Sequence, residues 1–279
     1  MESSKIITLN DGLNIPHIGF GTYQLNGSDG AENIKNAIEL GYRLIDSAFN
    51  YENEGAVGEA LRRTSVPREE LLITSKLPGR HHIYNKAIQT VEESLYRSGL
   101  SYYDIYLIHW PNPIEDKYVE AWQALIECKK RGYLRSIGVC NFLPEHLERL
   151  QKETGVLPSI NQIELHPYFN QIDMLKWHQE QGIVVESWSP LGRGNDILSQ
   201  DIITSIAGRH DKSASQVVLR WHVQHGAVPI PKAASKEHQL ENLTIFDFSL
   251  TSEEMELIDS LTRKDGRINN QDPAIYQEF

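Results

Sequence analysis

The chain alternates between two kinds of hydrophobic pattern. Short apolar, β-branched runs without strict alternation are typical of strands that are buried on both faces of a parallel sheet. Eight such runs occur, at residues 17–22, 43–48, 71–76, 103–110, 136–141, 160–165, 183–189 and 227–232. Helix-patterned stretches such as 30–41, 85–99 and 213–226 lie between them. The pattern therefore predicts repeated strand–helix units.

Eight strand–helix units in 279 residues predict one α/β domain spanning residues 1–279, a (β/α)8 TIM barrel. Before the first unit, Asp11-Gly12 stands between alternating apolar residues, which predicts a β-hairpin. We expect this hairpin to cap the bottom of the barrel. A doubly wound open sheet is the alternative, but no strand–turn–helix segment carries the G-x-G-x-x-G pattern of its dinucleotide-binding form.

Composition narrows the class of protein. With 38 acidic and 27 basic residues the net charge is −11, which argues against a nucleic-acid or anionic-membrane partner. The two cysteines, Cys128 and Cys140, are too few for a disulfide framework, so we expect a reducing, cytoplasmic location. The polar N-terminus lacks the apolar stretch of a signal peptide, and no run reaches membrane-spanning length.

Polar residues close several of the predicted strands. In such barrels the chemistry lies at the C-terminal ends of the strands and in the loops that follow them. Each residue alone is more often structural: a lysine that reaches solvent, a turn carboxylate or a hydrogen-bonded core histidine. Their convergence at one face favours a site. The residues are Asp46, Tyr51, Lys76, His109, Asn141 and Lys232.

Four of these side chains form a set suited to proton transfer. A buried Lys76 held by Asp46 would favour the anionic form of a nearby acid. Tyr51 could be that acid, and His109 could orient an oxygen atom. No G-x-S-x-G nucleophile motif or metal-ligand set is present. The pairs His81–His82 and His222–His225 lack a third ligand, so we interpret them as solvated surface.

The segment 230–239, "IPKAASKEHQ", predicts an anion site. Lys232 ends a strand, and Ser235 could cap the helix that follows. Free N–H groups and the helix dipole at such an N-terminus favour negative charge.

Seven motifs in order resemble those of the aldo-keto reductase superfamily, in particular the bacterial-type soluble glyoxal, methylglyoxal and diketogluconate reductases. Residues 41–61 are similar to its first signature, with Asp46 and Tyr51 five residues apart. "LLITSK" resembles the catalytic-lysine strand and "YDIYLIHWP" the histidine strand. The other four are "SIGVCNF", "INQIELHP", "SWSPLGRG" and "IPKAASKEHQLEN".

The resemblance implies NAD(P)H-dependent reduction of an aldehyde or ketone by direct hydride transfer. It casts Tyr51 as the proton donor, Lys76 as the group that lowers its pKa, Asp46 as the partner of Lys76, and His109 as the group that orients the carbonyl. The implied cofactor is NADPH/NADP+, with NADH as an alternative, and the implied state is a monomer. The implied cofactor-binding residues are Gly21, Thr22, Tyr23, Asp46, Cys140, Asn141, Gln162, Trp188, Ser189, Leu191, Arg193, Lys232, Ala233, His238, Glu241 and Asn242. The implied substrate mouth is lined by Tyr23, Asn50 and Trp110.

The sequence departs from the family pattern at three positions. Cys140 stands where the family usually has serine, a stronger hydrogen-bonding group. Ala233 and His238 replace the serine and arginine that normally grip the 2′-phosphate of NADP, so we expect a weaker preference for NADPH. The short tail, "DPAIYQEF", leads us to expect an open, permissive pocket.

Two other functions stay open at this stage. Some relatives on this fold are binding subunits or structural proteins, and the four-residue set argues against that role here. A phosphate-binding barrel isomerase or aldolase would use Lys76 as a Schiff-base nucleophile.

Overall fold

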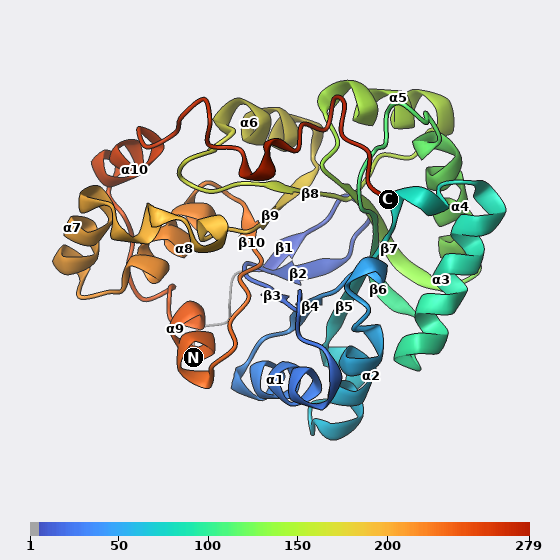
Figure 1. Ribbon diagram of the computed structural model, residues 1–279, viewed down its shortest axis with the longest axis horizontal. Helices are drawn as coiled ribbons and strands as arrows, with labels where there is room; N and C mark the ends of the chain where they lie inside the picture. The colour runs from blue at the N-terminus through green and yellow to red at the C-terminus, as the bar shows by residue number, and fades with distance from the viewer. Residues whose placement is uncertain (1–5) are drawn as a thin grey trace.

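The computed structural model describes residues 6–279 and contains a ring of eight parallel strands surrounded by helices (Figure 1). The strands follow the chain in order around the sheet, and every neighbouring pair is parallel. They are β3 (Phe20–Gly21), β4 (Leu44–Asp46), β5 (Leu72–Leu77), β6 (Tyr103–Ile108), β7 (Leu134–Cys140), β8 (Ile160–Glu164), β9 (Val184–Trp188) and β10 (Val228–Pro229).

Backbone hydrogen bonds between the first and last strands close the ring. Gly19 N–H donates to Pro229 O and Gly21 N–H to Pro231 O, each at 3.0 Å. On the other side of β10, Ile230 N–H donates to Ser187 O of β9 at 3.0 Å. The predicted (β/α)8 barrel is therefore confirmed, and the open doubly wound sheet is excluded.

Helices cover the outside of the strands. Helix α8 illustrates how the sequence starts them: the Ser213 side chain accepts from Gln216 N–H while the Gln216 side chain reaches back to Ser213, a capping box. The helices are α1 (Gly27–Leu40), α2 (Glu54–Arg63), α3 (Tyr84–Ser98), α4 (Tyr118–Lys130), α5 (Pro144–Thr154), α6 (Ile172–Gln181), α7 (Asp201–His210), α8 (Ala214–Gln224), α9 (Lys236–Leu243) and α10 (Ser252–Asp259).

The N-terminal hairpin caps one end of the barrel, as predicted. Strands β1 (Ile6–Thr8) and β2 (Asn14–Pro16) pair antiparallel around the Asp11-Gly12 turn. Leu9 and Ile15 pack in one buried cluster with Leu44, Leu107 and Ile160. In Figure 1, β1 and β2 project onto the middle of the strand ring.

The side-chain period of two explains how the strands deliver polar groups to the barrel interior. Leu44 lies in the interior cluster, so Asp46, two residues on, has the same parity; Leu107 and His109 are related in the same way. Residues of the other parity, such as Ile45 and Ile108, belong to the outer cluster between strands and helices. Apolar residues therefore fill the barrel interior on the side of the N-terminal hairpin, and polar residues gather at the C-terminal ends of the strands.

Candidate active site

A pocket of about 660 Å³ opens at the C-terminal ends of the strands. It receives residues from nearly every strand end, as expected for this fold. The predicted residues that line it are Gly21, Tyr23, Asp46, Asn50, Tyr51, His109, Trp110, Cys140, Asn141, Gln162, Trp188, Ser189, Leu191, Arg193 and Lys232. The predicted residues that do not line it are Thr22, Lys76, Ala233, His238, Glu241 and Asn242.

A buried ion pair joins Asp46 in the pocket lining to Lys76 beneath it. Lys76 is fully buried, and its Nζ donates to both carboxylate oxygens of Asp46 at 2.7 Å and to Ser47 O at 2.8 Å. Burial alone would lower the pKa of Lys76, but Asp46 and Tyr51 outweigh burial and hold that pKa above its usual value. The ammonium is therefore charged and has no freedom to leave the pair.

The Tyr51 ring stands over this ammonium. Lys76 Nζ lies 5.1 Å from the centroid of the ring. Burial raises the pKa of the Tyr51 hydroxyl to about 12, while Lys76 acts in the opposite direction. The expected lowering by Lys76 is thus present, but in the isolated protein burial outweighs it. Tyr51 consequently carries its proton at neutral pH.

The loop that carries Tyr51 is held on both sides. Tyr51 closes a short 3₁₀ turn, Phe49–Tyr51, between β4 and α2. Asn53, buried just after it, accepts from Ser47 Oγ at 2.7 Å and donates to Thr22 O at 2.7 Å and Leu25 O at 3.2 Å. These bonds tie the Tyr51 loop to the ends of the first two barrel strands.

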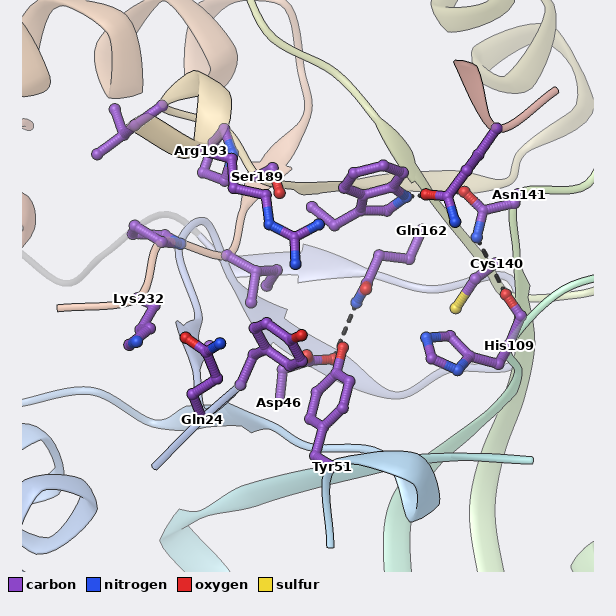
Figure 2. A pocket seen from close by; sticks show the side chains of 18 of the residues that line it. Gln24, Asp46, Tyr51, His109, Cys140, Asn141, Gln162, Ser189, Arg193 and Lys232 are labelled. Atoms are coloured by element: carbon purple, nitrogen blue, oxygen red, sulfur yellow. Dashed lines mark hydrogen bonds between the residues drawn. The ribbon is translucent and has the colours of Figure 1, made fainter. Parts of the chain in front are cut away.

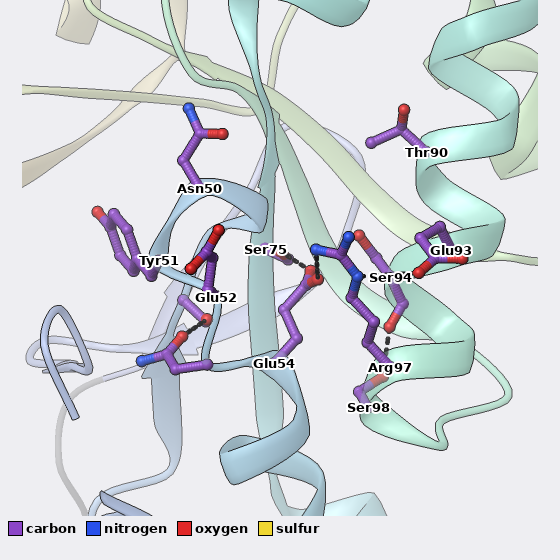
Figure 3. Close-up of polar contacts among 12 residues, drawn as sticks. Asn50, Tyr51, Glu52, Glu54, Ser75, Thr90, Glu93, Ser94, Arg97 and Ser98 are labelled. Carbon is purple, nitrogen blue, oxygen red and sulfur yellow. Dashed lines mark hydrogen bonds and ion pairs between the residues drawn. The ribbon is translucent and has the colours of Figure 1, made fainter. Parts of the chain in front are cut away.

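Glu54 anchors the start of α2 against the neighbouring elements. Its Oε1 accepts from Ser75 Oγ at 2.6 Å, next to Lys76 on β5, and Arg97 lies 3.7 Å from its Oε2. Figure 3 shows Glu54 pointing away from Tyr51, toward Ser75, Ser94 and Arg97. Burial raises the pKa of Glu54 against these contacts. The network joins the Tyr51 loop to the Lys76 strand from behind.

A second buried carboxylate extends the polar floor. Gln162 Nε2 donates to Asp46 Oδ1 at 2.9 Å, as Figure 2 shows, and to Glu186 Oε2 at 2.8 Å. Burial and the nearby Asp46 raise the pKa of Glu186 to about 7. Both N–H groups of the Gln162 amide thus donate to carboxylates, so its amide oxygen is left for other contacts. Sequence reasoning missed Glu186, although its interior parity with Trp188 on β9 marks it.

His109 meets a residue that the sequence did not indicate. Its Nδ1 lies 2.6 Å from Oε1 of Glu278, in the C-terminal segment. Glu278 also accepts from Asn50 Nδ2 at 2.8 Å and Gly79 N–H at 2.9 Å. The Tyr276 ring lies against Trp110, with ring centroids 4.4 Å apart.

The C-terminal segment therefore lines the pocket through Tyr276 and Glu278, next to the predicted substrate residues Asn50 and Trp110. The short C-terminal tail was expected to leave the pocket open and permissive, but at this end the tail itself forms part of the pocket wall. The physical reason is the set of hydrogen bonds that this segment makes with loops from across the barrel, which no local pattern encodes.

Asn141 and Trp188 meet above the floor. Asn141 adopts a left-handed φ of 62°, donates to His109 O at 3.0 Å, and accepts from Trp188 Nε1 at 2.7 Å. Figure 2 shows the bond between Asn141 and His109. Cys140 is 1% exposed, and burial raises the pKa of its thiol well above its usual value. A protonated thiol is a poor nucleophile.

Cationic side chains mark the opposite end of the pocket. Figure 2 places Arg193 and Lys232 away from His109, with Asp46, Tyr51 and Gln162 between. Gly21 allows the backbone of the segment after β10 to pack closely here, since a Cβ would lie 3.1 Å from Ile230 O. The pocket thus runs from a basic end to an aromatic and amide-lined end, which suits a dinucleotide with phosphates at one end and an aromatic amide ring at the other.

The outer residues of this end lie beyond the pocket wall. Ser235 caps α9 by accepting from His238 N–H at 3.2 Å, as its sequence predicts, and His238 is exposed. Ala233 and Asn242 are buried. The Ser213 hydroxyl donates to the Glu241 carboxylate.

Two histidines predicted at the solvated surface are buried. His222 is fully buried on α8 and lies 3.1 Å from both Ser187 Oγ and Pro190 O, so it supports the loop after β9. Burial lowers its pKa to about 3. His82 is 2% exposed. The prediction was wrong at both positions because α8 and the loop before α3 turn these sides inward, which a two-histidine spacing does not reveal.

Within residues 6–279, no cluster of three or more histidine, cysteine, aspartate or glutamate side chains has a metal-binding arrangement. The same residues include no helix with the length and apolarity needed to span a membrane.

Comparison with known proteins gives the same picture. The profile of the Aldo/keto reductase family matches residues 17–263. The chain is 45% identical over 279 residues to 2,5-diketo-D-gluconic acid reductase B of a Corynebacterium species, covering 100% of both chains. It is 43% identical over 272 residues to a glyoxal reductase of Bacillus subtilis, covering 97% of each chain.

A solved structure extends the likeness to the cofactor. The crystal structure of a Gox0644 mutant in complex with NADPH superposes with a TM-score of 0.93 at 41% identity, covering 99% of this chain and 100% of that one. The chain therefore belongs to the aldo/keto reductase family and is an NADPH-dependent oxidoreductase that reduces carbonyl compounds.

Proposed function

We propose that this enzyme reduces small aldehydes, α-dicarbonyl compounds, keto acids or sugars to alcohols, with Tyr51 as the proton donor. The relatives named for diketogluconate and glyoxal reduction support this substrate range. The observation that carries the proposal is the position of the Tyr51 ring, whose centroid lies 5.1 Å from Lys76 Nζ, while Lys76 is paired with Asp46. Burial raises the pKa of the Tyr51 hydroxyl to about 12, so the group has a proton to donate at neutral pH.

In this proposal, NADPH binds along the pocket with its phosphates toward Arg193 and Lys232. The amides of Asn141 and Gln162 would hold the carboxamide, and the indole of Trp188 offers a stacking face. Ser189 and Leu191, in the loop that His222 supports, would cover the pyrophosphate. A bound NADPH supplies the hydride.

The residues of the chain would supply the proton and its control. Tyr51 would transfer its phenolic proton to the oxygen of the reduced carbonyl group, and the Lys76 ammonium beneath it would stabilise the resulting phenolate. Asp46 keeps Lys76 charged and fixed. His109, at the substrate end, would orient the carbonyl oxygen.

A Schiff-base reaction at Lys76 fits the geometry poorly. A nucleophilic amine must be neutral and exposed to substrate, whereas Lys76 is buried and paired with both oxygens of Asp46. We expect borohydride trapping with a carbonyl substrate to leave Lys76 unlabelled. Labelling of Lys76 would favour the aldolase alternative.

Steady-state kinetics with NADPH and NADH across methylglyoxal, phenylglyoxal and nitrobenzaldehyde test the proposal. We expect turnover of several of them, with NADPH preferred. A purified, folded sample that oxidises neither cofactor with any of them would contradict the proposed substrate range.

A monomeric state and a cytoplasmic location remain predictions. Two buried, unbridged cysteines, Cys128 and Cys140, support a reducing compartment. Sedimentation and cell fractionation would test the two predictions.

A further inference from the structure

The substrate end of the pocket contains a carboxylate that the proposed reaction does not use. Glu278 touches His109, Asn50 and Gly79 through its two oxygens, and its side chain is 10% exposed. A carbonyl group that reaches His109 and Tyr51 must therefore pass beside this negative charge.

The backbone of Glu278 is held as firmly as its side chain. Asn112, fully buried, accepts from Glu278 N–H at 3.0 Å and donates to Glu278 O at 2.8 Å. Asn112 packs directly on Gly79, where a Cβ would lie 2.3 Å from its amide nitrogen. Because the buried amide of Asn112 bonds both the N–H and the C=O of Glu278, this residue is a fixed part of the pocket wall.

Contacts on both sides of Glu278 hold the segment in place. Arg80 donates to the main-chain oxygen of Phe279 at 2.8 Å and to Asn50 Oδ1 at 2.6 Å. On the other side, Tyr276 packs on Trp110. In Figure 1 the red segment beyond α10 crosses from one side of the molecule to the other before it ends.

The charge at this position is well defined. Burial would raise the pKa of Glu278, but His109, the Gly79 N–H and Asn50 outweigh it and hold that pKa below its usual value. A fixed carboxylate in a partly desolvated pocket repels a second anion more strongly than it would in water.

We propose that Glu278 determines which substrate charge the pocket accepts. It selects uncharged aldehydes and α-dicarbonyl compounds over carbonyl compounds that carry a carboxylate beside the reacting carbon. The inference rests on the proposed function and narrows it, since keto acids become the disfavoured members of the proposed range. His109 remains the contact for the carbonyl oxygen, and Glu278 sets which neighbouring group is tolerated.

Pyruvate and ethyl pyruvate test this inference because they share the reacting ketone and differ in charge. The measured quantity is kcat/KM for pyruvate divided by kcat/KM for ethyl pyruvate. Comparing this ratio between variants cancels the difference in intrinsic reactivity of the two ketones. The variants are Glu278→Gln, which removes the charge, Glu278→Asp, which retains it, and Glu180→Gln, which removes an exposed charge on α6.

We expect Glu278→Gln to raise the ratio by about tenfold or more, in keeping with a unit charge a few ångströms away in a partly desolvated site. Glu278→Asp should stay nearer to the wild-type ratio than Glu278→Gln does, and Glu180→Gln should leave the ratio unchanged. A merely structural role of Glu278 would lower both kcat/KM values together and leave their ratio unchanged.

An unchanged ratio in Glu278→Gln, with ethyl pyruvate still reduced, would overturn the inference and leave the proposed function intact. A lower ratio would overturn it too, because it would identify the Glu278 contacts as a binding site for substrate carboxylates. If the wild type reduces neither ethyl pyruvate nor methylglyoxal, the proposed function fails and the inference fails with it.

Discussion

We expect that Tyr51 can be separated from cofactor binding, because in the proposed reaction its hydroxyl contacts the substrate, whereas the cationic end of the pocket lies elsewhere. We expect Tyr51→Phe to lower kcat by about 10²- to 10⁴-fold, the usual contribution of a positioned proton donor. The NADPH dissociation constant, measured by fluorescence titration, should change little. Substantial turnover in this variant would remove Tyr51 as the proton donor.

The Lys76–Asp46 pair makes a second prediction at the scale of single residues. Asp46→Asn leaves a buried ammonium without its counter-ion, which typically costs about 3–5 kcal/mol of unfolding free energy. The pKa of Lys76 should fall, since burial is then opposed by Tyr51 alone among its main partners. Urea unfolding measures the loss. A loss below about 1 kcal/mol, within the range of ordinary surface substitutions, would mean that the pair is not essential to the core.

At the scale of elements, the loop between β4 and α2 places Tyr51 through Asn53. The Asn53→Ala variant removes bonds to Thr22 O, Leu25 O and Ser47 Oγ. Thr22 O keeps the N–H of Leu25, but the Leu25 carbonyl and the Ser47 hydroxyl lose their Asn53 partner, at a cost of about 1–3 kcal/mol. Because the Tyr51 loop loosens, kcat should fall more than NADPH affinity does. Equal losses in both would indicate general unfolding and not misplacement of Tyr51.

The Glu254 carboxylate of helix α10 pairs with Arg209 and His210 of α7. We expect this contact to be sensitive to acid. Burial would raise the pKa of Glu254, but His210, Thr251 N–H and Arg209 outweigh it and lower that pKa to about 2. A lowered pKa stabilises the fold above the unfolded-state value, near 4.5, and this stability is lost as pH falls toward 2.

Glu254→Gln should therefore lower the unfolding free energy at neutral pH by about 1–3 kcal/mol. It should also flatten the decline of stability between pH 4.5 and 2. Chemical denaturation at several pH values tests both effects. An acid decline as steep as that of the wild type would assign it to other carboxylates.

The elements differ in how far the sequence predicts them. An apolar run in the sequence predicts each buried strand. The polar residue that ends the run lies two positions after an interior apolar residue, as Asp46 follows Leu44 and His109 follows Leu107. Strands β3 and β10 span only two residues each, and the bonds between them run one way, from Gly19 and Gly21 to Pro229 and Pro231, since proline has no N–H to donate in return. The contact of Glu278 with His109 depends on a segment without periodicity, so local pattern cannot reveal it.

At the scale of the whole molecule, an acidic chain must concentrate positive charge where an anionic cofactor binds. The net charge is −11, yet Arg193 and Lys232 both line the basic end of the pocket. This local focus was predictable from Lys232 and the helix that follows it. The contribution of Arg193 depends on the loop after β9, which His222 supports from α8. The sequence did not indicate this support, because the i,i+3 spacing of His222 and His225 was interpreted as solvated surface.

The same focus predicts how cofactor preference can be changed. His238 is exposed in the first turn of α9, beyond Lys232, and an arginine there would bring a permanent charge and a bidentate fork to the 2′-phosphate. We expect His238→Arg to raise the NADPH/NADH ratio of kcat/KM by about tenfold, the factor that roughly 1.4 kcal/mol supplies. The His238→Gln variant is the control, since its side chain cannot carry charge and should not raise the ratio. If His238→Arg leaves the ratio at its wild-type value, position 238 lies outside the reach of the phosphate, and Lys232 with Arg193 must account for the preference.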